Sequence, residues 1–303
     1  MTRKSLSITQ EQLSDSICSV ETLSRIENGS QKPTRDTYEL LMERMGRIRS
    51  RAYSILSVSD LKVLEKMKLF EDYIKMYDFY KAEKLLEEIE CIIGNSILDQ
   101  QFIIRANGLV NYQLKRISIS DLLLEFQKAI RMTIPKYGHI SLANWPLSFS
   151  EVTILINMSS VFAEKGDFNS AISILEEVYS ALKQSYMEES QRAILQVTIT
   201  SNLSKIYGII LNHEKAIEIA HEGISICKKF RLGNVLPYLL YNIAWNKEKL
   251  INMGVLLINK NECLSYLKQA YYIASAMQLS YVGELIKEHI TTGYDTVQAN
   301  FID

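Results

Sequence analysis

The sequence predicts an all-α protein, with a small N-terminal helical domain followed by an α-solenoid, and three observations support this fold class. Only 12 Gly and 4 Pro occur in 303 residues, which favours long helices over a many-stranded sheet. A similar helix start recurs five times along the chain, as expected for stacked helix pairs. The N-terminal segment carries the capping and turn signals of three short helices.

The composition is that of an ordinary soluble protein. Hydrophobic residues make up 47% of the chain and charged residues 23%. No apolar run approaches the length of about 18 residues that a membrane-spanning helix needs, and no signal-peptide core follows Met1. The four cysteines lie far apart in the sequence, which favours free thiols in a reducing compartment. We therefore expect a cytoplasmic protein that does not bind membranes.

Capping signals define a helix-turn-helix over residues 1–50. Thr9 and Gln12 have the spacing of a capping box that starts one helix, and Ser19 is a good N-cap for a second. Gly29 supplies a left-handed stop, and Thr34 starts a third, supporting helix. The side chains expected to form the core of this domain are Leu13, Ile17, Leu23, Ile26, Tyr38, Leu41, Met42 and Met45.

The segment from Thr9 to Thr34, TQEQLSDSICSVETLSRIENGSQKPT, resembles the lambda-repressor-like (XRE) DNA-binding domain. Its ICSVETLSRIENG portion is similar to the head of the Rgg/PlcR-type peptide-responsive regulators of Gram-positive bacteria. The resemblance implies a transcription regulator used in quorum sensing. Its partners would be an operator in double-stranded DNA and a short signalling peptide.

In a helix-turn-helix, the second helix enters the major groove by its N-terminus. We expect Ser19, Val20, Glu21 and Thr22 to face the bases, and Gln10 and Arg25 to contact phosphates or flanking positions. Thr22 can offer a methyl group to thymine, and Glu21 can accept from a cytosine amine. Glu21 has an alternative role as an acidic residue that stabilises the first turn of its helix. Residues 1–51 hold nine Lys or Arg against seven Asp or Glu, a slightly basic balance that suits a DNA reader.

The XRE pattern has a full helix before the TQEQL segment, and an Arg at its end pairs with the Glu of the RIENG motif. Spacing assigns these two roles to Arg3 and Glu27. Because only two residues precede Arg3, we expect helix 1 to be incomplete and part of the Leu13, Ile26 and Leu41 core to be uncovered. Either the natural start lies upstream, or the DNA-binding domain is damaged.

The remainder predicts a linker over 51–59, a TPR-like ligand-binding and dimerisation domain over 60–290, and a frayed tail over 291–303. The recurring helix start has a small alanine that lets two helices approach closely. These alanines are Ala82, Ala129, Ala171, Ala216 and Ala270. The stretches around Ala171 and Ala216 resemble the second helix of tetratricopeptide repeats. Residues 133–150, which contain Pro135, Gly138 and Pro146, predict one long irregular connection.

Asparagines recur at one register of the first helices in these pairs. Asn157, Asn202 and Asn242 align, and a fourth first helix offers Asn107 or Asn111. On the concave surface of a solenoid, Asn amides can hold the backbone of an extended peptide, because each carries a donor and an acceptor. Side-chain pockets are expected from Tyr207, Tyr241 and Trp245. Alternatively, the asparagines cap loops or bond between neighbouring helices.

The sequence shows no catalytic, cofactor or metal signature. The four histidines are isolated from one another, and no phosphate-binding glycine motif is present. We therefore expect no enzyme activity and no cofactor, and a homodimer because an operator with two half-sites needs two reading heads. The rival prediction is a TPR scaffold for a partner-protein segment, with a vestigial helix-turn-helix that does not bind DNA.

Overall fold

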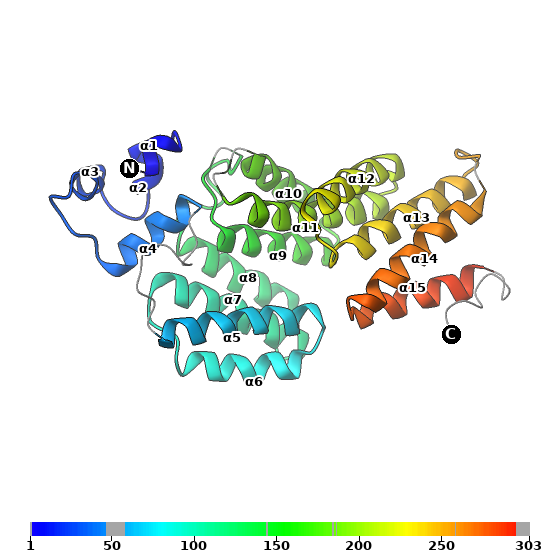
Figure 1. The fold of residues 1–303 in the computed structure, drawn as a ribbon, viewed down its shortest axis with the longest axis horizontal. Helices are drawn as coiled ribbons and strands as arrows, with labels where there is room; N and C mark the ends of the chain where they lie inside the picture. The colour runs from blue at the N-terminus through cyan, green and yellow to red at the C-terminus, as the bar shows by residue number, and fades with distance from the viewer. Residues whose placement is uncertain are drawn as a thin grey trace. The chain divides into compact units, whose positions relative to one another are not determined.

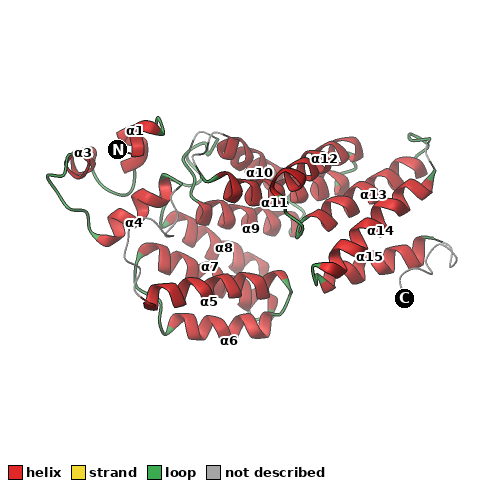
Figure 2. Ribbon diagram, in the orientation of Figure 1, coloured by secondary structure: helices red, strands yellow, loops and turns green. Residues whose placement is uncertain are grey.

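The computed structural model describes residues 2–46, 58–143, 145–183, 185, 187–257 and 259–294, and throughout these ranges its regular elements are helices (Figures 1 and 2). The prediction of an all-α chain is therefore confirmed. The chain divides into two compact units, Met1–Arg192 and Ala193–Asp303, which we call unit 1 and unit 2. None of the described helices is both long enough and apolar enough to cross a membrane.

Unit 1 begins with four short helices whose caps follow from the local sequence. They are α1 (Thr2–Ser5), α2 (Gln10–Ser14), α3 (Val20–Glu27) and α4 (Arg35–Arg44). The Thr9–Gln12 capping box is present, and the Ser19 and Thr34 side chains accept from the third amide of the helix that each starts. Gly29 has a φ of 75°, as a left-handed stop after α3 requires.

The core of this N-terminal domain is better covered than the sequence suggested. Leu13 and Leu41 are 2% and 5% exposed, so the expectation that part of the Leu13, Ile26 and Leu41 core is uncovered is wrong for these two leucines. The residues that follow α1 explain the difference, because Ile8 is buried in the same cluster and Leu6 packs against it. Ile26 is half-buried and also contacts this cluster.

Three helix pairs complete unit 1. They are α5 (Val58–Lys75) with α6 (Phe79–Glu90), α7 (Ile97–Gln113) with α8 (Ile119–Arg131), and α9 (Phe149–Glu164) with α10 (Phe168–Lys183). The recurrence of small residues is explained by packing, because Ala82, Ala129 and Ala171 are fully buried in the second helices. The predicted irregular connection is confirmed between α8 and α9. Residues 47–57, with most of the expected 51–59 linker, lie outside the described residues, and α5 begins at Val58.

Unit 2 continues the alternation. It contains most of α11 (Glu189–Ile209), followed by α12 (His213–Phe230), α13 (Leu236–Asn252), α14 (Lys260–Ala276) and α15 (Ser280–Gly293). Ala216 and Ala270 are again fully buried in second helices. Helix α15 packs on α13 and α14 and extends to Gly293, so the prediction of a frayed tail from residue 291 is wrong for its first three residues. Val282, Ile286 and Ile290 hold it there, because all three are buried in the core of unit 2.

Candidate functional site

The N-terminus of α3 is the candidate DNA-reading surface. Ser19 is exposed, and its hydroxyl oxygen accepts from the Thr22 amide at 3.1 Å and lies 3.1 Å from the Thr22 hydroxyl. Val20 and Thr22 are half-buried, whereas Glu21 and Arg25 are exposed. Four of the six residues expected to contact DNA thus occupy the start of one helix, with Arg25 in its last turn.

The Glu21 side chain has a local role in this helix. Its own backbone amide and the Ser19 hydroxyl stabilise the carboxylate and lower the pKa of Glu21 below its ordinary value. An ionised carboxylate in the first turn is favourable for the helix dipole but unfavourable beside phosphates. The geometry therefore supports the capping role of Glu21 more directly than a contact with cytosine.

Arg3 and Glu27 join the first helix to the end of the third. Arg3 Nε donates to Glu27 Oε1 at 2.6 Å, and its Nη1 donates to the Ile8 backbone oxygen at 2.7 Å. The arginine hydrogen bond is the main reason that the pKa of Glu27 lies below its ordinary value. Gln10 Nε2 donates to the same carboxylate at 2.7 Å. Gln10 was expected to contact a phosphate, but one hydrogen of its side-chain amide is already used within the domain.

A line of open side chains runs along α9 in unit 1. Thr153, Asn157, Ser160 and Glu164 are half-buried or exposed and follow the spacing of one helix face. We call this line the unit 1 stripe. Asn157 Oδ1 accepts from Arg105 Nη1 on α7 at 3.4 Å. Glu164 accepts from the Tyr112 hydroxyl, which raises the pKa of Tyr112 to about 12.

Helix α7 contributes a residue that sequence reasoning missed. Arg105 is buried and donates to both Asn157 and Glu71, which connects α5, α7 and α9. Asn107 instead donates to Glu90 on α6 at 2.6 Å, and Asn111 accepts from Arg116 at 3.4 Å. The two asparagines expected at this register therefore lie on another side of α7, since Asn107 and Asn111 are about 160° and about 120° from Arg105 around the helix.

Unit 2 has a corresponding set of open side chains on α11 and α13, which we call the unit 2 stripe. Its members are Thr198, Asn202, Lys205, Ile209, Tyr238, Asn242, Trp245 and Lys249. Asn242 Nδ2 donates to the Ser201 backbone oxygen at 3.1 Å, whereas Asn202 has no hydrogen-bond partner among the described residues. Lys249 lies over the Trp245 ring at 5.1 Å, and no member of the stripe is acidic.

The two tyrosines expected at side-chain pockets lie beside this stripe. Tyr207 is half-buried on α11, five residues after Asn202 and so more than a third of a turn away from it. The Tyr241 hydroxyl lies 3.1 Å from His289 Nδ1 on α15, and burial raises the pKa of Tyr241. Tyr241 is therefore engaged with the last helix of the unit.

A buried asparagine behind the unit 2 stripe also escaped the sequence prediction. Asn246 is 1% exposed, its Oδ1 lies 2.8 Å from His213 Nδ1, and its Nδ2 donates to the Asn242 backbone oxygen at 2.7 Å. Helices α11 and α13 approach closely here, because a Cβ at Gly208 would lie 2.6 Å from Asn246 Oδ1. The signal available in the sequence was the polar run of α13 that begins at Asn246 and lies between Trp245 and Leu250.

No cluster of three or more His, Cys, Asp or Glu suited to a metal ion occurs in the described part of the chain. His289 lies in a small polar group, and its Nε2 lies 2.8 Å from Glu248 Oε2. Tyr294 donates to the other oxygen of Glu248, so this group links α13 to the end of α15. The contacts of Glu248, His289 and Tyr294 are hydrogen bonds that hold two helices together.

Comparison with known proteins gives a family for the N-terminal domain and a shared fold for the whole chain. Residues 1–48 match the helix-turn-helix family, so the N-terminal domain is an XRE-type helix-turn-helix. No curated protein matches the sequence significantly.

Among solved structures, the chain resembles Bacillus thuringiensis PlcR in complex with the peptide PapR7 and DNA, with a TM-score of 0.65, 17% identity, and coverage of 94% of this chain and 95% of that chain. It also resembles apo ComR, the competence regulator of Streptococcus vestibularis, with a TM-score of 0.54, 14% identity, and coverage of 97% and 96%. The chain thus shares, over nearly its whole length, the fold of these regulators.

Proposed function

We propose that this protein is a DNA-binding transcription regulator whose helical repeats bind a short signalling peptide. The observation that supports it most is the joint presence of an XRE-type helix-turn-helix and a fold shared with PlcR, whose solved structure contains a peptide and DNA. The protein would act as a cytoplasmic homodimer without enzymatic activity, because two reading heads match an operator with two half-sites.

The DNA contact is assigned to the N-terminus of α3. Thr22 would read a base edge from the first turn, and Arg25 would neutralise a phosphate from the last. Ser19 fixes the first turn as its N-cap, which leaves the exposed side of the helix free to enter the major groove.

The peptide contact is assigned to the unit 2 stripe first. The side-chain oxygen and nitrogen of Asn202 are both available, and Asn242 retains a free side-chain oxygen. The pair can therefore bond to the backbone of an extended peptide. Lys205 and Lys249 add positive charge with no acid on the same stripe, which favours a peptide that carries a carboxylate. Trp245 is half-buried, and its ring offers an apolar contact.

Fluorescence anisotropy on DNA selected from a randomised duplex pool tests the DNA-binding half. A regulator should retain a tight, sequence-dependent component at about 200 mM salt, whereas a scaffold with a vestigial head should show only weak binding that salt removes. Arg25→Ala should reduce the slope of log affinity against log salt by about one. Lys128→Ala, which removes the same charge from the exposed side of α8, should leave the slope unchanged.

A further inference from the structure

A buried arginine anchors the DNA-reading domain to the repeats of unit 1. Arg44, in the last turn of α4, is 5% exposed, and its Nη2 donates to the Thr133 backbone oxygen at 3.0 Å. Its Nη1 donates to the Asp15 backbone oxygen, and its guanidinium lies 5.4 Å from the Trp145 ring centre. Burial lowers the pKa of Arg44, which shows that these contacts are made at the expense of solvation.

Thr133 is itself held by helix α7. Gln101 is 1% exposed, and its Nε2 donates to Thr133 Oγ1 at 2.9 Å and to the Ala129 backbone oxygen at 2.9 Å. A buried amide with two acceptors fixes the position of the residue whose carbonyl receives Arg44. The start of the α8–α9 connection is therefore clamped between α4 and α7.

The same face of α7 carries the contact with the unit 1 stripe. Arg105 lies four residues after Gln101, so the two side chains are neighbours on the helix surface. Arg105 donates to Asn157 on α9 and to Glu71 on α5. Four buried polar residues, Arg44, Thr133, Gln101 and Arg105, thus lead from the DNA-reading domain to the stripe.

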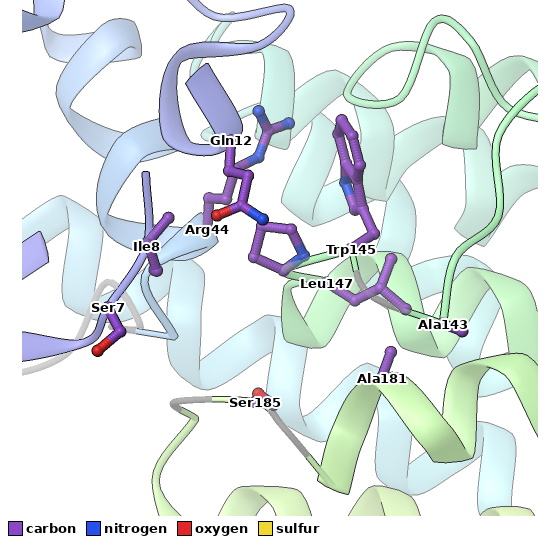
Figure 3. Close-up of a pocket in the computed structure, with 10 residues that line it drawn as sticks. Ser7, Ile8, Gln12, Arg44, Ala143, Trp145, Leu147, Ala181 and Ser185 are labelled. Carbon is purple, nitrogen blue, oxygen red and sulfur yellow. The ribbon is translucent and has the colours of Figure 1, made fainter. Parts of the chain in front are cut away.

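The junction also contains polar groups that its present arrangement does not satisfy. Trp145 Nε1 and Gln101 Oε1 are buried and lack hydrogen-bond partners among the described residues. A cavity of about 330 Å³ lies beside Trp145, with Gln12 and Arg44 on one side and Trp145 and Leu147 on the other (Figure 3). Unpaired buried groups cost free energy, so this junction is less stable than one in which every polar group is paired.

We infer that Arg44 is a positioning residue of the DNA-reading domain, and that Gln101 and Arg105 on α7 set its position through the contact of α7 with Asn157 on α9. The inference rests on the proposed function for its biological meaning, because the domain that Arg44 positions is the proposed DNA reader. The physical claim is that a change at Arg105 alters the contact between Arg44 and Trp145.

Trp145 can report on this contact directly. The chain has two tryptophans, so Trp245→Phe leaves Trp145 as the only indole. In that background, Arg44→Ala should shift Trp145 emission to longer wavelength and increase its quenching by acrylamide, because the ring loses its buried cation. Arg105→Leu should cause roughly half or more of the same change, although Arg105 contacts neither residue.

The matched control is Asn107→Ala, which alters α7 on another side. It should leave Trp145 emission and quenching unchanged. Arg105→Lys keeps a donor for Glu71 and should restore most of the Trp145 protection. In a double-mutant cycle, Arg44→Ala and Arg105→Leu should be non-additive, because the second change acts through the first.

Circular dichroism and thermal melting identify variants that fail to fold, and Gln101→Met then replaces Arg105→Leu as the interruption of the path. The inference is overturned if folded Arg105→Leu and Gln101→Met both leave Trp145 unchanged, or if Asn107→Ala changes it equally. The experiment uses neither DNA nor peptide, so its failure is distinguishable from failure of the proposed regulator function in the salt series.

Discussion

The stripes of the two units share a register but differ in how their polar groups are satisfied. In unit 1, Asn157 bonds to buried Arg105, and Glu164 bonds to Tyr112. In unit 2, Asn202 has no partner among the described residues, and Lys205 and Lys249 have no acid on the stripe. A polar group that is already paired stabilises the fold, whereas an unpaired one at a partly open position is available to a ligand. We therefore propose that the same repeat position serves structure in unit 1 and peptide recognition in unit 2.

The largest expected effect tests the structural half of this comparison. Glu71→Leu should lower the free energy of unfolding by about 3 kcal/mol, because Arg105 would remain buried without its counter-charge. The loss is at the lower end of the range for buried pairs because the Glu71 side chain is 32% exposed. Urea unfolding followed by circular dichroism measures the change, and Glu87→Leu on exposed α6 surface is the control. Equal stability of Glu71→Leu and the parent protein would contradict the prediction.

Asn202→Ala tests the recognition half. The affinity for a peptide selected from a random heptapeptide pool should fall by about 1–3 kcal/mol, since a peptide backbone group would lose its partner. The free energy of unfolding should change by only about 0.5 kcal/mol or less, because Asn202 makes no hydrogen bond in the described structure. Calorimetry of binding and urea unfolding measure the two quantities.

Asn246→Ala is the matched control for this pair of measurements. It should mainly lower stability, because His213 and the Asn242 carbonyl oxygen would lose a buried partner. Equal losses of stability and affinity in Asn202→Ala would instead make Asn202 a structural residue like Asn246.

A smaller effect on the stability of unit 2 is expected from the titration of Glu248, which lies on the other side of α13. Burial would raise the pKa of Glu248, but hydrogen bonds from His289 and Tyr294 outweigh it, so the pKa lies below the ordinary value of 4.5. A lowered folded-state pKa contributes stability that is fully present above the unfolded-state value and is lost as pH falls through the folded-state value.

Unit 2 should therefore lose stability below about pH 4.5, and Glu248→Gln should weaken this dependence. Urea unfolding at a series of pH values between neutral and acid conditions measures the slope. An identical slope in Glu248→Gln would assign the acid sensitivity to other carboxylates.

Much of the fold was predictable because its signals are local. The Thr9–Gln12 capping box and the Ser19 cap depend on residues three apart, so the sequence displays them directly. The five buried alanines were also visible, because close helix packing demands a small residue at a regular spacing. Helix α15 was harder to delimit, since its end depends on packing against α13 and α14.

The candidate peptide-binding residues were predicted less completely. Asn157, Asn202 and Asn242 lie on open helix faces, as their shared register suggested. Asn107 and Asn111 do not share the face of Arg105, because a match of residue type in one helix cannot specify its rotation against the next. Arg105 and Asn246 were missed because a buried polar residue is recognisable only once its partners are known.

The sequence by itself determined the class of this protein: an all-α chain, an XRE-type reading helix that starts after Ser19, and five pairs of helices stacked through small residues. Tertiary structure decided which polar groups are used internally and which remain open. Arg44 contacts Thr133 across 89 residues of sequence, and no local pattern encodes such a contact. Periodicity specifies which face of a helix is buried, but the identity of the neighbour that satisfies a buried charge depends on how the helices pack.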